Sequence, residues 1–104
     1  RFDSLTETNL YRVAQEAVNN SLKYANSTFV LVSVSHTKDL LSIVIDDNGA
    51  GFDVDAVEAS EKGLGMGLFF MKERVKYVDG RLFVNSTKGE GTRITINIPL
   101  SSIN

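Results

Sequence analysis

The chain contains no cysteine, which excludes both a disulfide framework and a thiolate metal site. It lacks any apolar run approaching the roughly 20 residues that span a bilayer, and its first four residues do not resemble a signal peptide. Its 11 basic and 13 acidic side chains give a net charge of -2, too little cationic field to gather nucleic acid or anionic lipid. These absences favour a cytoplasmic protein that contacts neither nucleic acid nor the membrane directly.

The remaining composition is typical of one globular domain. The chain has 104 residues, of which 42% are hydrophobic and 23% are charged, enough to bury a single core. Because the sequence does not begin with methionine, we expect it to be a piece of a longer protein. A polyanionic ligand would need local donors and a divalent cation, since the overall charge does not attract it.

Hydrophobic periodicity predicts two helices and four strands. Apolar residues recur at helical spacing over about 5–25, and Ser4 and Glu7 have the spacing of a capping box. A second amphipathic helix is predicted after residue 62, ending at Gly80. Segments rich in Val, Ile and Leu predict strands at 29–35, 40–46, 82–86 and 92–100. The order helix, hairpin, helix, hairpin predicts an α+β fold, a two-layer sandwich with helices on one face of a mostly antiparallel mixed sheet.

Two glycine clusters stand out in this framework. They are Asp47-Asn48-Gly49-Ala50-Gly51, after a strand, and Gly63-Leu64-Gly65-Met66-Gly67, before the second helix. Unpaired N–H groups and the macrodipole at a helix start favour phosphate, and glycine lets the backbone approach it closely. The alternatives are a tight turn for the first cluster and a flexible linker for the second. Neither cluster matches G-x-G-x-x-G, a P-loop or the protein-kinase motifs.

The first predicted helix carries a polar stripe formed by Glu16, Asn20 and Lys23, which steps of four and three residues bring to one side. Asn20 can supply an oxygen to Mg²⁺, an ion that commonly completes its shell with phosphates and waters. Glu16, one turn earlier, could orient or deprotonate a group that attacks a terminal phosphate. The alternative is a solvated helix face with no such role.

Four motifs in this order resemble those of the ATP-binding catalytic domain of bacterial sensor histidine kinases, in particular those paired with NarL-type response regulators. Residues 15–25 resemble the N box, 47–52 the G1 box, 63–68 with 71–75 the G2 box and its helix, and 89–92 the closing glycine-threonine element. The resemblance covers nearly the whole chain. It implies the Bergerat fold, shared with gyrase, and Mg-ATP as ligand.

The resemblance also implies roles for individual residues. Asn20 would coordinate Mg²⁺, Glu16 would take the catalytic acid/base position, and Lys23 would meet phosphate. Asp47 would accept a hydrogen bond from the adenine amino group, supported by Thr92. A carboxylate there repels the carbonyl of guanine, and an unpaired buried polar group costs about 1–3 kcal/mol. Gly49 and Gly51 would let the backbone pass close to the base. Gly63, Gly65 and Gly67 would do the same for the phosphates. The segment 52–62 would form the lid.

By this resemblance, residues 1–104 are a histidine protein kinase catalytic domain that lacks the usual first strand and the phosphoacceptor domain. The chain would donate the γ-phosphoryl group to a histidine on a separate helical dimerisation domain, within a homodimeric parent that signals to a NarL-type regulator, whereas the fragment itself would be a monomer. The sole histidine, His36, is predicted to be a surface residue of a hairpin loop. The alternatives are an ATPase of the same fold, an anti-sigma-factor serine kinase and a catalytically silent nucleotide-binding module.

Phe69 and Phe70 extend the apolar character of the second helix beyond one stripe. We expect them to be buried in the core. The alternative is that one of them docks against the histidine-bearing helical domain.

Overall fold

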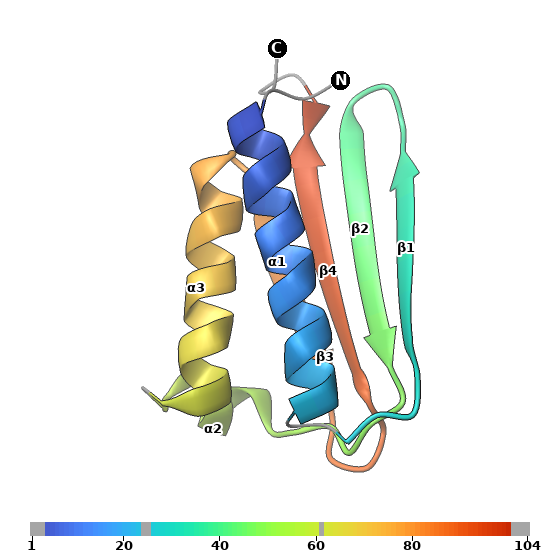
Figure 1. Cartoon of the computed structure of the whole chain (residues 1–104), viewed down its shortest axis with the longest axis vertical. Helices are drawn as coiled ribbons and strands as arrows, with labels where there is room; N and C mark the ends of the chain where they lie inside the picture. Colours follow the sequence, from blue (N-terminus) through green and yellow to red (C-terminus); the bar gives the residue numbers. More distant parts are fainter. Residues whose placement is uncertain (1–3, 24–25, 61, 101–104) are drawn as a thin grey trace.

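The computed structural model describes residues 4–23, 26–60 and 62–100, which form helices over one face of a sheet (Figure 1). The elements follow in the order α1 (Ser4–Lys23), β1 (Val30–His36), β2 (Leu40–Asp47), α2 (Val54–Glu58), α3 (Gly63–Tyr77), β3 (Arg81–Ser86) and β4 (Thr92–Pro99). The strand order is β1-β2-β4-β3, and each neighbouring pair is antiparallel. The predicted α+β sandwich is confirmed, without a parallel pair among the described strands.

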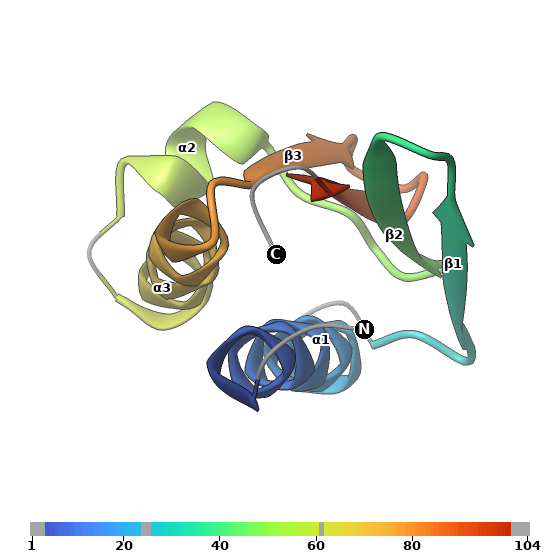
Figure 2. The same ribbon diagram turned by 90° about the horizontal axis from the view of Figure 1, so that it is seen from above.

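The core lies between the sheet and the two long helices, which lie side by side under one face (Figure 2). Alternate residues of β2 and β4 point into it, because successive side chains of a strand face opposite sides. Complete burial of a Leu, Ile or Met side chain contributes about 1.5–3 kcal/mol. The buried apolar residues are Val13, Ala17, Leu41, Ile43, Ile45, Leu68, Met71, Val75, Ile94, Ile96 and Ile98.

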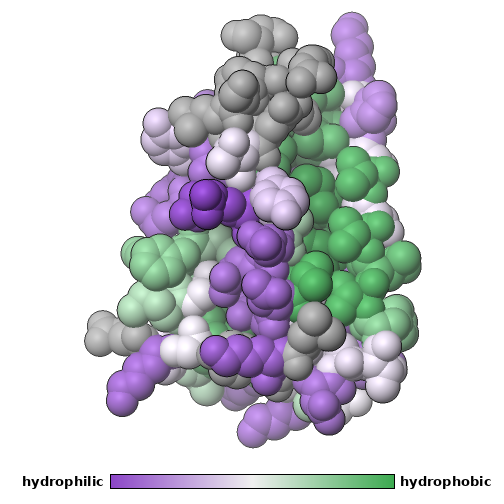
Figure 3. All heavy atoms as spheres, viewed as in Figure 1, coloured by the Kyte–Doolittle hydropathy of each residue, from purple (hydrophilic) through white to green (hydrophobic). Residues whose placement is uncertain are grey.

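The edge strand β1 is left largely uncovered by the helices. Val32 and Val34 share the helix-facing side with Ile45 and Ile43 of β2, yet they are 46% and 64% exposed. The space-filling view shows the resulting hydrophobic area over β1 and β2, beside the hydrophilic surface of α1 (Figure 3). Two apolar side chains on the helix-facing side of an edge strand therefore lack the cover that β2 and β4 receive.

The sequence-based expectations and the structure differ in several places. The predicted hairpin loop begins one residue too early, because His36 ends β1 and pairs with Leu41. Gly80 was expected to end the second helix, but the left-handed residue there is Asp79, with φ 61°. The side chains of the predicted Ser4–Glu7 capping box are not among those that the structure describes. Residues 24–25, at the end of the predicted first helix, lie outside the described residues.

The predicted burial of Phe69 and Phe70 is wrong. Both side chains are 56% exposed, and they contact each other edge to face with ring centroids 5.9 Å apart. Leu68, Met71 and Val75 already form the core-facing side of α3, so the two rings lie on sides of α3 that are exposed to solvent. An aromatic pair exposed in this way is available to a partner.

The segment 52–62 also contains an unexpected short helix, α2. It begins after Asp53, whose side chain accepts a hydrogen bond from Ala56 N at 3.2 Å. An ion pair between Glu58 and Lys72 ties α2 to α3. The segment expected to be a lid is thus partly ordered against α3. No helix among residues 4–23, 26–60 and 62–100 is long and apolar enough to cross a membrane.

Candidate functional site

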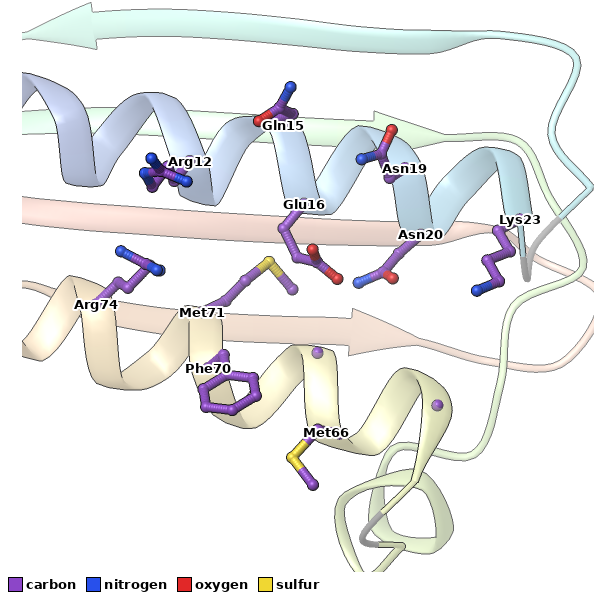
Figure 4. A pocket seen from close by; sticks show the side chains of 12 residues that line it. Arg12, Gln15, Glu16, Asn19, Asn20, Lys23, Met66, Phe70, Met71 and Arg74 are labelled. Carbon is purple, nitrogen blue, oxygen red and sulfur yellow. The ribbon is translucent and has the colours of Figure 1, made fainter.

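A cleft of about 800 Å³ runs between α1 and α3 (Figure 4). One wall comes from a single stripe of α1 and the other from α3. The residues that line it are Arg12, Gln15, Glu16, Asn19, Asn20, Lys23, Gly63, Met66, Gly67, Phe70, Met71 and Arg74. The predicted stripe of Glu16, Asn20 and Lys23 therefore faces one continuous cavity, together with two of the three glycines of the second cluster.

Two polar groups in this cleft are not satisfied by the protein itself. Asn20 is only 8% exposed, and its Nδ2 atom has no hydrogen-bond partner within the described part of the chain. Glu16 is half-buried and forms no ion pair among the same residues. Buried polar groups are normally paired, because an unmade hydrogen bond costs about 1–3 kcal/mol, and of these two side chains only Asn20 carries such a buried, unpaired atom. Unpaired groups facing a cavity are suited to a polar ligand.

A second, inner cavity joins the stripe to the first glycine cluster. It has a volume of about 20 Å³, and Asn20 lines both this cavity and the cleft. Asp47 and Thr92 lie on its wall with Ser21, Phe52 and Leu64. Such a volume holds about one water molecule, so a planar aromatic ring enters only if Phe52 and Leu64 move apart. The structure thus brings Asn20 and Asp47 to one connected site.

Asp47 is held in place by neutral donors. Ser21 Oγ donates to Asp47 Oδ2 at 2.7 Å, and Gly49 N donates to Asp47 Oδ1 at 2.9 Å. No cation among the described residues pairs with it. The adjacent Asp46 differs, because it pairs with Arg93 on the other sheet face at 2.6 Å, and the hydrogen bond and charge of Asp46 raise the pKa of Arg93. Of these two aspartates, only Asp47 therefore faces a cavity with its charge uncompensated.

Thr92 sits directly across from Asp47 in the β2–β4 register and belongs to a small hydroxyl network. Its Oγ1 shares a hydrogen bond of 2.8 Å with Ser86 Oγ. Ser86 Oγ also accepts from Phe52 N at 2.9 Å and lies 3.1 Å from Gly91 O. The Ser86 hydroxyl therefore links the Thr92 hydroxyl to the backbone of Phe52.

The predicted glycines have different surroundings. A Cβ at Gly67 would lie 2.8 Å from Glu16 Oε2, so the absence of a side chain there lets α3 approach the α1 stripe. Gly65 does not line the cleft, and a Cβ on it would lie 2.3 Å from Val57 O and from Ser60 O, at the contact with the lid segment. Gly51 lies against the loop that joins β3 and β4, beside Thr87 O. Only Gly63 and Gly67 of this group border the cleft.

The donor set of the cleft fits a cation that is shared with a ligand. Within the described ranges, no group of three or more His, Cys, Asp or Glu side chains could hold a metal ion alone. Mg²⁺ commonly takes one or two protein oxygens and completes its shell with phosphates and waters. The Asn20 side chain, which lines the cleft, suits that role, because its Oδ1 atom can supply one such oxygen, and its unpaired Nδ2 is a donor that fits a phosphate oxygen of the ligand.

Four further residues of the site were not identified from the sequence. Ser21 and Ser86 are hydrogen-bonding partners of Asp47 and Thr92, and Arg12 and Arg74 line the end of the cleft beyond Glu16. Arg12 could have been found, since it precedes Glu16 by one turn on the same stripe. Ser86 could have been found by placing it opposite Thr92 in the predicted hairpin. Ser21 and Arg74 depend on packing between distant segments.

Comparisons with known proteins agree with this architecture. The sequence model of the family described as histidine kinase-, DNA gyrase B-, and HSP90-like ATPase matches residues 6–102. The signal transduction histidine-protein kinase/phosphatase DegS of Bacillus subtilis (strain 168) is 47% identical over 96 residues, which are 91% of this chain and 24% of DegS. DegS of Brevibacillus brevis is 37% identical over 102 residues, or 98% of this chain and 25% of that protein. The chain thus spans about a quarter of the length of these relatives.

Solved structures show the same fold. The blue-light activated histidine kinase of Erythrobacter litoralis EL346 superposes with a TM-score of 0.76 at 27% identity, over 92% of this chain and 31% of the kinase. A histidine kinase domain of the same protein gives a TM-score of 0.74 at 24% identity, over 93% of this chain and 46% of that domain.

Proposed function

This chain belongs to the histidine kinase-, DNA gyrase B- and HSP90-like ATPase family, and we propose that it binds Mg-ATP and donates the γ-phosphoryl group to a histidine of a separate helical domain. The likeness to DegS supports a place in two-component signalling. The observation that carries the proposal is the connected site in which Asn20 and Asp47 face one cavity. That cavity opens at Asn20 into the cleft lined by Glu16 and Gly67.

Different residues along this site bind different parts of Mg-ATP. The Asp47 carboxylate accepts a hydrogen bond from the adenine amino group, with the Thr92 hydroxyl beside it. Asn20 Oδ1 binds Mg²⁺, and Lys23 with the N–H groups at the start of α3, near Gly63 and Gly67, contacts phosphate. Mg-ATP, when bound, would supply the γ-phosphoryl group, and ADP would be the leaving group. Glu16 faces the same cleft and orients the acceptor imidazole or takes up its proton.

We propose that the partner in this reaction is the histidine-bearing dimerisation domain of a homodimeric parent kinase, and that a NarL-type regulator receives the phosphoryl group next. His36 is not suited to be the acceptor, because it is exposed at the end of β1, whereas Glu16 faces the cleft between α1 and α3. Phe69 and Phe70 form an exposed apolar pair on α3, and Phe70 lines the cleft itself. This placement supports the docking of the helical domain against that side of α3.

We also propose that the domain is completed by one further strand, paired with β1. The outer edge of β1 has no neighbour among the described strands, and Val32 and Val34 on its helix-facing side are exposed. An exposed apolar edge is a hazard that proteins usually cover. A strand along this edge would bury both valines. The ATP site does not depend on it, because every residue of the inner cavity belongs to α1, β2, β4, α3 or the loop after β2.

Calorimetry with ATP, ADP and GTP, each with and without Mg²⁺, tests the proposed function. We expect Mg²⁺-dependent binding of ATP and ADP and weak binding of GTP, and we expect Asp47→Asn to reduce the preference for adenine. Asp46→Asn is the matched control, because Asp46 points to the other sheet face and pairs with Arg93. Equal affinity of the wild type for ATP and GTP would contradict the role of Asp47. Phosphohistidine formation on an added helical domain separates a kinase from a silent binding module.

A further inference from the structure

We propose that Arg12 and Arg74 form a subsite that binds a carboxylate of the histidine-bearing helical domain, and so position the acceptor against Glu16. This inference rests on the function proposed above. The two arginines belong to different helices and line the same end of the cleft (Figure 4). Neither forms an ion pair within the described part of the chain.

The position of Arg74 is fixed by a neutral partner. Its Nη1 donates to Oδ1 of Asn9 at 3.2 Å, and Asn9 is a buried residue of α1. A guanidinium has five N–H donors, and an amide oxygen uses one of them without compensating the charge. The remaining donors are available at the cleft, where Arg12 brings a second cation. Two like charges at one end of a cleft repel each other, and a bound anion would relieve that repulsion.

The spacing along α1 argues that this anion is not part of the nucleotide. Arg12 precedes Asn20 by eight residues, which at a rise of about 1.5 Å each places it about 12 Å along the helix axis. Glu16 lies halfway between them. A phosphate that shares a cation with Asn20 must lie close to that residue, since Mg²⁺ binds oxygen at about 2.0–2.1 Å. Arg12 and Arg74 both lie on the side of Glu16 away from Asn20 (Figure 4), which is the side from which we infer that the acceptor approaches.

The chemistry of this end of the cleft fits an acidic, partly apolar helix. Arginine binds carboxylate with two parallel hydrogen bonds, which fixes the orientation as well as the position of the partner. Phe70 lies one turn before Arg74 on the same wall of the cleft, and Gln15 adds an amide from α1. A carboxylate held by both arginines would place neighbouring side chains of the same partner helix next to Glu16.

The test compares Arg12→Gln, Arg74→Gln and the double variant with the wild type in two assays. We expect ATP affinity to stay within about twofold, whereas the KM for the purified helical acceptor domain rises about tenfold or more in the double variant, as expected for loss of a charge pair at an interface. Added NaCl should raise this KM in the wild type and have less effect in the double variant. Lys76→Gln is the matched control, because Lys76 is an exposed cation of α3 that pairs with Glu73 outside the cleft.

Charge reversal identifies the partner group. Arg74→Glu should be rescued by lysine at one acidic position of the acceptor domain and at no other.

Two results would overturn the subsite. A parallel loss of ATP affinity in the double variant would show that the arginines contact the nucleotide. An unchanged KM in the double variant would show that they contact nothing. If the wild type does not transfer phosphoryl at all, the proposed function fails, and direct titration of the acceptor domain into the wild type and the double variant still decides the subsite. Melting temperatures of all variants show whether each one is folded. Arg74→Lys, which keeps the positive charge, is included as a milder change.

Discussion

Ser21 and Asp47 are joined by a hydrogen bond of 2.7 Å from the Ser21 hydroxyl to Asp47 Oδ2, although 26 residues separate them in the chain. The bond links the end of α1, which carries the polar stripe, to the end of β2, where the first glycine cluster begins. It therefore couples the part of the site assigned to the cation with the part assigned to the base.

The first prediction concerns this bond. Ser21→Ala removes the donor that orients Asp47, and we expect ATP affinity to fall about fivefold, which corresponds to roughly 1 kcal/mol for one hydrogen bond. The preference for ATP over GTP should fall with it, measured by calorimetry. Ser42→Ala is the control, because its hydroxyl bonds to Asn97 Oδ1 at 2.8 Å on the other face of the sheet. Wild-type affinity and selectivity in Ser21→Ala would contradict a positioning role.

Asn20→Ala should separate stability from function. The Nδ2 atom of Asn20 is buried without a partner, and such an unmade hydrogen bond costs about 1–3 kcal/mol, so its removal should leave the melting temperature unchanged or raise it. Mg²⁺-dependent ATP affinity should fall in the same variant. The control is ATP binding without Mg²⁺, which should be equally weak in both proteins. An equal loss with and without the metal would mean that Asn20 does not bind it.

Glu16→Gln is expected to spare binding and slow the transfer. The amide keeps the size of the side chain but can neither carry the charge nor take up a proton. ATP affinity should remain within about twofold, whereas the single-turnover rate of phosphohistidine formation on a helical acceptor should fall by about 10²-fold or more. Glu73→Gln, at an exposed residue of α3, serves as the control. Unchanged transfer in Glu16→Gln would remove Glu16 from the reaction.

Much of this architecture follows from local sequence signals. The alternation of Ile94, Ile96 and Ile98 and the helical spacing of Val13 and Ala17 predict the elements and their buried sides correctly, because burial of one face dictates that spacing. The short helix α2 was missed, since five residues give no periodicity, although Asp53 is a typical N-cap.

The parts that were not predicted depend on contacts between distant segments. Phe69 and Phe70 could not be assigned to the surface until Leu68, Met71 and Val75 were seen to complete the core-facing side of α3. Likewise, Gly65 was grouped with its neighbouring glycines, yet its Cβ position is blocked by carbonyl groups of the lid segment. Periodicity identifies a buried face, but it does not say which segment packs against it.

The exposed aromatic pair gives a prediction that tests partner docking. Phe69→Ser and Phe70→Ser should change the melting temperature little, because both rings are more than half exposed. Phe70 lines the cleft, so Phe70→Ser should raise the KM for the helical acceptor domain, whereas ATP affinity stays constant. Tyr77→Ser, at an exposed aromatic residue near the end of α3 outside the cleft, is the control. If phosphorylation per folded molecule is unchanged in both phenylalanine variants, the docking proposal fails.

Gly65 and Gly67, both in α3, should respond in opposite ways to the same substitution. In Gly67→Ala the added Cβ would lie 2.8 Å from Glu16 Oε2 and 3.3 Å from Asn20 Nδ2, both at the ends of side chains that can move. Alanine also favours the helix over glycine by about 1 kcal/mol. We therefore expect Gly67→Ala to keep or raise the melting temperature, and to reduce phosphoryl transfer by displacing Glu16.

In Gly65→Ala the Cβ would lie 2.3 Å from two backbone carbonyl oxygens, those of Val57 and Ser60, which cannot turn away without moving the lid segment. This variant should lose stability despite the better helix propensity, and its melting temperature should fall relative to Gly67→Ala. Thermal unfolding of both variants, followed by circular dichroism, makes the comparison with each glycine as the control for the other. If Gly65→Ala were the more stable of the two, the close packing of the lid segment on α3 could not be the reason for glycine at that position.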